Sequence, residues 1–255
     1  MILYFSSTGN SKHIAERLGE SLKEKIISIE DCLKNNIYSF DLEEGEKFGV
    51  VSPVYFFGLP TIVSKYIDSL EIPNSNYYYA CLTYGSNVGS AGKQIENVFQ
   101  SKGTKLNGLF GIKMVDTYSP IFNLNNNIKN KNILYQADKK LDKIIFKIKI
   151  KSYGKFGLKQ LPSFITKSFY RKYAKTPNTH KFEVLNYCIG CSKCAENCPN
   201  QAIELQDGKP VWIKDKCTLC LRCLHHCPKF AIQYGKKTLK HGQYDYNNYQ
   251  KNKNL

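Results

Sequence analysis

The chain opens with the apolar run Met1-Ile2-Leu3-Tyr4-Phe5 and continues with Ser6-Ser7-Thr8-Gly9-Asn10-Ser11. The apolar run predicts a buried strand, and Ile14, Leu18 and Leu22, four residues apart, predict a helix over 10–25. The hydroxyl-rich loop therefore lies at a helix N-terminus, where backbone N–H groups and the helix dipole bind anions. It lacks a G-x-G-x-x-G pattern and a Walker lysine, which argues against NAD and ATP. The alternative is a serine-rich helix cap without a ligand.

Four more apolar runs follow, separated by amphipathic stretches. Strands are predicted at 26–29, 47–52, 77–84 and 109–116, and helices at 61–70, 90–100 and 131–150. A shorter basic helix is expected around Leu161, Phe164, Ile165, Phe169 and Tyr173. Alternating strands and helices are typical of a parallel sheet with crossover helices. The sequence thus predicts an α/β, doubly wound domain with five parallel strands.

Two further loops follow the third and fourth predicted strands, at the edge of such a sheet where ligands bind. The candidate binding residues in the first loop are Pro53, Val54, Tyr55, Phe56, Phe57 and Gly58. Those in the second loop are Thr83, Tyr84, Gly85, Ser86, Asn87 and Gly89. Aromatic side chains offer faces to a planar ring, and glycine lets the backbone approach its polar atoms. The alternative is that the aromatic residues belong to the core.

Eight of the ten cysteines form two copies of the run C-x2-C-x2-C-x3-C-P. They are Cys188, Cys191, Cys194 and Cys198 before Pro199, and Cys217, Cys220, Cys223 and Cys227 before Pro228. This spacing is typical of proteins with two 4Fe-4S clusters, in which the fourth cysteine of each run binds the other cluster. It predicts one cluster on Cys188, Cys191, Cys194 and Cys227, and a second on Cys217, Cys220, Cys223 and Cys198. The alternatives are zinc sites, which usually use two spaced pairs, and disulfides.

The sequence also supports predictions for the two remaining cysteines and for two histidines. Cys32 and Cys81 are expected to be small apolar residues of the core. His225 and His226 lie within the second cysteine run and are expected to be exposed. The alternative is that they tune the second cluster or take up a proton.

The net charge of +16 is concentrated in the middle of the chain. Residues 118–182 hold 15 Lys and Arg against 2 Asp and Glu, whereas residues 1–117 hold 11 against 13. The lysines from 139 to 159 form the densest stretch. They form either a solvated helix face, a docking site for an acidic redox protein or a peripheral membrane contact. No motif for reading a nucleic-acid sequence accompanies them.

No secretory leader precedes the first predicted strand, and no apolar run reaches the length of a membrane span. The chain is therefore expected to be cytoplasmic, where clustered cysteines usually bind metal. Its oligomeric state cannot be read from the sequence.

The chain resembles the flavodoxin–ferredoxin fusion family of anaerobic bacteria and archaea. The resemblance rests on Ser7–Ser11, Pro53–Tyr55, Thr83–Gly85 and the eight cysteines. It implies that residues 6–11 hold the phosphate of FMN, with Ser11 where the common pattern has Thr. It also implies that the FMN ring lies among Tyr55, Phe56, Phe57, Tyr84, Gly85 and Asn87.

The resemblance further implies how the chain is divided. The expected parts are a flavodoxin-like domain at 1–150, a basic helical linker at 151–180, a small α+β two-cluster ferredoxin domain at 181–235 and a polar basic tail at 236–255. The tail is rich in Asn and Lys and is expected to be extended or disordered in part. The expected function is electron transfer between the two clusters and FMN within one chain. The alternatives are an FMN-dependent reductase of a small substrate, with Tyr118 and 123–127 near its pocket, and a redox sensor without FMN. An acidic ferredoxin or flavodoxin is the expected partner.

Overall fold

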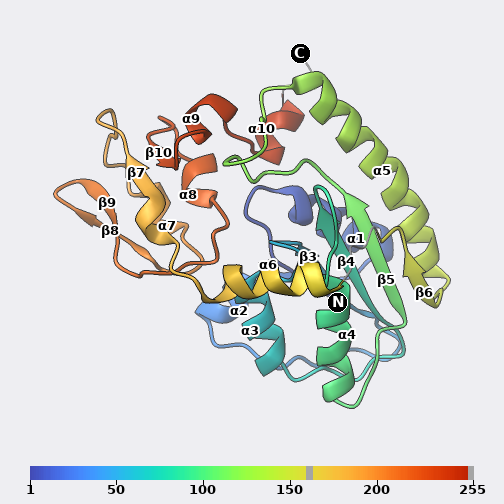
Figure 1. The fold of residues 1–255 in the computed structure, drawn as a ribbon. Helices are drawn as coiled ribbons and strands as arrows, with labels where there is room; N and C mark the ends of the chain where they lie inside the picture. Colours follow the sequence, from blue (N-terminus) through green and yellow to red (C-terminus); the bar gives the residue numbers. More distant parts are fainter. Residues whose placement is uncertain (159–162, 252–255) are drawn as a thin grey trace. The chain divides into compact units, whose positions relative to one another are not determined.

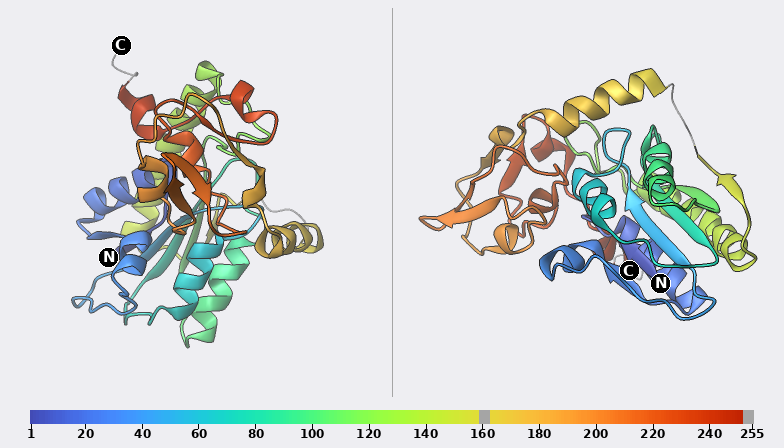
Figure 2. Two further views of the ribbon diagram at one scale, coloured as in Figure 1. Left: turned by 90° about the vertical axis from the view of Figure 1, so that its left-hand side faces the viewer. Right: turned by 90° about the horizontal axis from the view of Figure 1, so that it is seen from below.

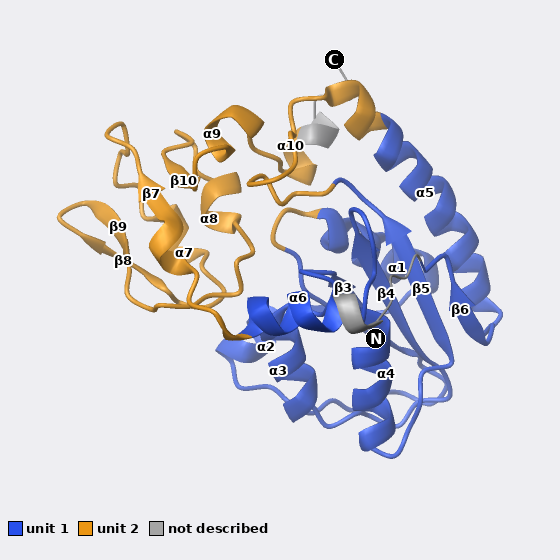
Figure 3. Ribbon diagram, in the orientation of Figure 1, with its two compact units in different colours: residues 1–6, 10–115, 132–174 blue, residues 7–9, 116–131, 175–255 orange. Residues whose placement is uncertain are grey.

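The computed structural model describes residues 1–158 and 163–251 and is shown in Figure 1. Its contacts divide the chain into two compact units, coloured separately in Figure 3. Unit 1 comprises residues 1–6, 10–115 and 132–174, and unit 2 comprises residues 7–9, 116–131 and the chain from 175 onward. Of the expected linker at 151–180, the described residues up to 174 belong to unit 1 and residues 175–180 belong to unit 2.

Unit 1 is built on a parallel sheet with the strand order β2-β1-β3-β4-β5-β6. The strands are β1 (Ile2–Tyr4), β2 (Ile26–Ser28), β3 (Phe48–Pro53), β4 (Tyr78–Tyr84), β5 (Gly108–Lys113) and β6 (Gly154–Phe156). The prediction of five strands was wrong by one, since β6 also pairs parallel with β5. This strand has only three residues and no apolar run. Its Phe156 ring stacks on Phe110 at 5.2 Å, a contact that sequence periodicity does not reveal.

Helices cover both faces of this sheet. They are α1 (Asn10–Leu22), α2 (Ile29–Lys34), α3 (Thr61–Ser69), α4 (Ala91–Ser101), α5 (Asn127–Lys149) and α6 (Ser163–Lys175). Figure 2 shows α3 and α4 against one face and α1 and α5 against the other. Two ion pairs join α1 to α5, from His13 to Asp138 at 2.7 Å and from Arg17 to Asp142 at 2.8 Å.

The apolar periodicity of the predicted helix at 131–150 is confirmed. Its inner face is buried along Leu134, Ala137, Leu141, Ile144, Ile145 and Ile148. In α6, Tyr173 is buried but Phe169 is exposed. Leu161 and the side chains of Phe164 and Ile165 lie outside the described residues.

The central strands are buried on both faces, as parallel sheets usually are. Leu3, Val50 and Cys81 are fully buried in β1, β3 and β4. Cys32 on α2 is also fully buried, so both isolated cysteines are core residues as predicted. Burial raises the pKa of both thiols, which keeps them protonated and unreactive.

Unit 2 is a small α+β arrangement, as predicted. Its strands are β7 (Phe182–Val184), β8 (Ile203–Gln206), β9 (Lys209–Trp212) and β10 (Ile232–Tyr234). Its helices are η1 (Thr179–Lys181), α7 (Lys193–Glu196), α8 (Arg222–His225), α9 (Thr238–His241) and α10 (Tyr246–Lys251). Strand β10 pairs antiparallel with β7, and β8 pairs antiparallel with β9. Each cysteine run thus leads through a one-turn helix toward a short strand.

The tail is more ordered than its composition suggests. It was expected to be extended or disordered in part, yet it contains α9 and α10. Tyr244 and Tyr246 in this tail are buried, and the burial of two aromatic side chains stabilises an ordered backbone in a polar tract. Residues 252–255, the last of the predicted tail, lie outside the described residues, as does Lys159 of the basic stretch.

Among the described residues, no helix combines the length and the apolar character needed to cross a bilayer.

Candidate cofactor sites

The first cavity in unit 2 collects cysteines from both runs. Cys188, Cys191 and Cys194 line it together with Cys227 from the second run, around about 370 Å³ including open solvent. Gly190 permits this loop to fold, because its φ is +62° and an added Cβ would lie 2.6 Å from the backbone oxygen of Gly208. The predicted crossing of the fourth cysteine is thus matched by the geometry.

The second cavity repeats this arrangement with the runs exchanged. Cys217, Cys220 and Cys223 line it with Cys198 from the first run, around about 310 Å³ including open solvent. Phe182 and Trp212 also line it, with their rings stacked at 4.5 Å. The cavity therefore has an apolar wall of the kind that controls solvent access to a metal centre.

The two crossing cysteines have matching hydrogen bonds. The N–H of Ala202 donates to Sγ of Cys198 at 3.4 Å, and the N–H of Ala231 donates to Sγ of Cys227 at 3.3 Å. In each case the donor lies four residues after the cysteine. Hydrogen bonds to the sulfurs around a cluster shift its reduction potential. The crossing cysteine of each cluster would therefore contribute a similar shift to the reduction potential.

The thiols suit a site that contains positive charge. Burial raises the pKa of Cys194 to about 11 and that of Cys217 to about 12. Buried thiolates are stable when a bound metal supplies the compensating charge, and binding then releases their protons. Among the described residues, no three His, Cys, Asp or Glu side chains converge on a single ion. The four cysteines of each set instead surround a cavity, as the ligands of a multi-iron cluster do.

The two cysteine loops differ in exposure. In the first run, Tyr187, Ile189 and Cys191 are exposed. In the second run, Leu219 and Leu221 are buried. Ile189 and Cys191 line the first cavity, so an exposed apolar side chain and an exposed cysteine lie at this site.

The hydroxyl-rich loop at 6–11 leads into α1, which begins at Asn10 as predicted and has no acidic residue in its first turn. The first N–H groups of a helix have no partner within it, so they suit an anion. Gly9 has a φ of +91°, and a Cβ there would lie 2.6 Å from that of Tyr246. Neutral donors, a glycine turn and a helix N-terminus without carboxylates fit the phosphate group of FMN.

Within unit 1, the end of this stretch, in the first turn of α1, meets the last residues of β4. The hydroxyl oxygens of Ser11 and Thr83 lie 2.8 Å apart. The backbone oxygen of Thr83 accepts from the N–H of Val54, which follows β3, at 2.8 Å. Residues from all three predicted loops thus come together at the carboxyl edge of the sheet.

The aromatic loop after β3 is a tight hairpin. The backbones of Tyr55 and Gly58 bond to each other in both directions, and Phe56 and Phe57 have φ values of 48° and 67°. Positive φ at both central positions is the backbone of a type I′ hairpin, and a non-glycine residue there costs about 1–3 kcal/mol. Gly89 makes room for this hairpin, because its added Cβ would lie 2.3 Å from that of Phe57.

Helix α6 packs on this hairpin, which the sequence did not indicate. The Phe56 ring stacks on Tyr173 at 4.6 Å, and the Phe57 ring meets Phe169 edge-on at 5.7 Å. Tyr84 is buried, and its hydroxyl donates to Gly157 at 3.2 Å. The aromatic residues therefore already have protein partners, and their contacts with a flavin ring stay a prediction. Of the remaining loop candidates, Asn87 accepts from the N–H of Gly89 at 2.7 Å.

Two further groups were missed or misjudged from the sequence. His225 was expected to be exposed but is buried, with Nε2 2.8 Å from the oxygen of Thr117 and Nδ1 accepting from the N–H of Tyr244. These bonds define a neutral ring with its proton on Nε2. Asp116 follows β5, and burial raises the pKa of its carboxyl. Its position after a strand of the sheet was the available signal.

Family comparisons agree with this geometry. The family model described as "Flavodoxin domain" matches residues 1–133, and the one described as "4Fe-4S dicluster domain" matches residues 187–231. The chain belongs to the flavodoxin domain family. Its C-terminal part is a 4Fe-4S dicluster domain with eight cysteines. The flavodoxin domain and the dicluster domain together indicate redox electron transfer.

Solved structures resemble the flavodoxin domain only distantly, and no curated protein matched the chain. One match is rubredoxin oxygen:oxidoreductase from Desulfovibrio gigas, at 17% identity and a TM-score of 0.38, which covers 59% of this chain and 36% of that one. Another is an FMN-dependent NADH-azoreductase from Bacillus anthracis in complex with FMN, at 11% identity and a TM-score of 0.36, which covers 58% of this chain and 97% of that one. The chain thus spans about a third of the length of the first.

Proposed function

We propose that this chain carries FMN in its flavodoxin domain and two 4Fe-4S clusters in its dicluster domain, and passes electrons among them within one molecule. FMN can accept two electrons, one at a time, whereas each cluster accepts one. A chain with both kinds of cofactor can therefore connect one-electron carriers with two-electron reactions. Residues 6–11 would hold the phosphate of FMN. The two crossed sets of cysteines would hold the clusters.

One observation carries the intramolecular part of the proposal. Ser7–Gly9, the middle of the proposed phosphate loop, belong to unit 2 together with all eight cysteines. Within that unit, the N–H of Tyr246 donates to the oxygen of Thr8 at 2.9 Å, and His226 Nε2 lies 3.0 Å from the oxygen of Ser7. His226 is the neighbour of Cys227 in the sequence. A phosphate loop held by residues of the cluster-binding unit favours joint use of the two kinds of cofactor.

Anaerobic purification followed by cofactor analysis tests the proposal. We expect about eight iron atoms and one FMN per chain, with absorption bands of both. About four iron atoms per chain would contradict the two-cluster assignment. If the chain binds no flavin after reconstitution, the proposal is wrong, and a redox sensor without FMN is the hypothesis that remains.

A second function is favoured by Asp116. Burial raises the pKa of this carboxyl, so it keeps its proton to higher pH than an exposed Asp. A reductase of a small substrate needs such an acid. Asp116 and Tyr118 lie in one segment of unit 2, where the N–H of Tyr118 donates to Oδ1 of Asp116 at 3.3 Å. The test is to screen candidate acceptors for reduction by the chain, with reduced ferredoxin as the electron donor. Turnover that is lost in Asp116→Asn, while that variant retains both cofactors, would support this function.

A further inference from the structure

The outer face of α5 carries exposed apolar side chains in a line. Tyr135 and Phe146 on α5 are 52% and 61% exposed, and Ile150, the residue directly after α5, is 58% exposed. The N–H of Ile150 still donates to the oxygen of Phe146 at 3.1 Å, so Ile150 continues the last helical turn. The opposite face of the helix is buried in unit 1. Their spacings of eleven and four residues place them on one side of a helix. From Tyr135 to Ile150 the line is about 22 Å long. Tyr153, which is also exposed, follows shortly after the helix ends.

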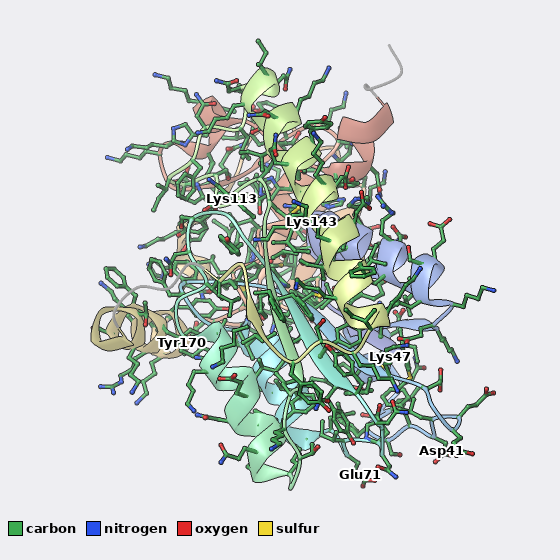
Figure 4. All side chains as sticks on the ribbon, turned by 90° about the vertical axis from the view of Figure 1, so that its right-hand side faces the viewer. Asp41, Lys47, Glu71, Lys113, Lys143 and Tyr170 are labelled. Carbon is green, nitrogen blue, oxygen red and sulfur yellow. The ribbon has the colours of Figure 1, made fainter. Side chains whose placement is uncertain are left out.

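Lysines surround this line. Lys139 lies within it, with its ammonium 4.3 Å from the centre of the Tyr135 ring. Lys143 and Lys149 are exposed on its two sides. Figure 4 shows Lys143 on α5, whereas the labelled carboxylates Asp41 and Glu71 lie elsewhere in unit 1.

The acidic residues of this part of α5 do not cancel the positive charge. Asp142 pairs with Arg17 at 2.8 Å, and Asp138 lies 2.7 Å from His13 and 3.9 Å from Arg17. Both carboxylates are therefore directed to partners on α1. The outer face keeps an excess of positive charge beside its apolar line.

We propose that this face of α5 binds the surface of an anionic lipid bilayer. Three apolar side chains in one line, two on α5 and one directly after its last residue, can enter a flat headgroup layer together, without a matching pocket on a partner. The lysines beside them reach anionic headgroups through their long side chains. The charge of the face is complementary to an anionic leaflet. This contact goes beyond the proposed electron transfer and does not depend on it.

The test is sedimentation of the full chain with vesicles of phosphatidylcholine alone or mixed with phosphatidylglycerol. We expect binding to the vesicles that contain phosphatidylglycerol and little binding to the others. The variant Phe146→Ser/Ile150→Ser should bind about tenfold more weakly. Its control is Leu239→Ser, which changes a side chain of similar exposure, 56%, outside α5 and should bind like the parent. Circular dichroism and cofactor content should be the same in all of them.

The charge is tested in the same assay. Lys143→Gln/Lys149→Gln should also weaken binding, whereas Lys65→Gln/Lys105→Gln, with the same loss of charge at exposed sites elsewhere in unit 1, should not. Equal losses in both lysine pairs, or no loss in Phe146→Ser/Ile150→Ser, would overturn the proposal. The proposal would also be overturned if the chain bound neither kind of vesicle but bound an acidic ferredoxin saturably, and if Lys143→Gln/Lys149→Gln abolished that binding. That last result would assign the face to a protein partner.

Discussion

The imidazole Nε2 of His226 lies 3.0 Å from the backbone oxygen of Ser7. On the other side of the ring, Nδ1 lies 3.2 Å from Oδ2 of Asp245. The ring thus connects the hydroxyl-rich loop to the tail, from a position directly before Cys227. The conformation of the proposed phosphate loop therefore depends on a residue of the cysteine run.

Replacing His226 with Ala should weaken FMN binding about fivefold, because a hydrogen bond of about 1 kcal/mol that holds the loop is lost. Titration of the flavin-free protein with FMN, followed by fluorescence, measures this affinity. His180→Ala, which removes an exposed histidine of the same unit, is the control and should bind like the parent. Equal affinities of the two variants would show that His226 does not support the loop.

Gly9→Ala should lower FMN affinity by at least about tenfold, since the left-handed backbone disfavours any side chain and the new Cβ would collide with Tyr246. Gly45→Ala is a matched control. Gly45 has a similar φ of +85°, but nothing lies within 4 Å of its added Cβ. Gly45→Ala should lose a little stability and no FMN affinity. If Gly9→Ala binds FMN like the parent, the phosphate lies elsewhere.

The sequence predicted the sheet well where burial is strong. Strands such as β3 and β4 are long apolar runs, and the inner face of α5 shows the helical period clearly. Strand β6 was missed because Gly154 and Lys155 are exposed and only Phe156 packs. The cysteine spacing indicated which cysteines gather, since a fixed cofactor geometry constrains sequence positions.

The remaining features depend on contacts between distant residues. The packing of α6 on Phe56 and Phe57 has no local signal, because aromatic residues occur in cores and in binding loops alike. The burial of His225 depends on Thr117 and Tyr244, which are far from it in the chain. The tail was misjudged because its two buried tyrosines stand in a polar tract.

The crossing of the cysteine runs can be tested with pairs of substitutions. Cys188→Ala and Cys227→Ala should affect the same cluster, so the double variant should lose no more iron than either single variant. Cys188→Ala/Cys198→Ala should affect both clusters. Iron analysis and electron paramagnetic resonance of the reduced proteins would distinguish these patterns. If Cys188→Ala/Cys227→Ala loses both clusters, each run binds its own.

Acid should destabilise the protein through His225. Burial lowers its pKa to about 4 from 6.5, so the unfolded state binds this proton more readily. The stabilisation is present above pH 6.5 and is lost as the pH falls toward 4, by about 3 kcal/mol in all. Urea unfolding of the parent and of His225→Asn should show a difference at pH 7 that shrinks over this range. A difference that is constant with pH would show that His225 does not titrate in this way.

The most direct test of the central claim is the kinetics of flavin reduction. The holoprotein is mixed anaerobically with a one-electron reductant, and the absorbance of clusters and flavin is followed. We expect fast reduction of the clusters, then reduction of FMN with a first-order rate constant that is independent of protein concentration. A rate of FMN reduction that rises in proportion to protein concentration would show transfer between molecules and contradict the account.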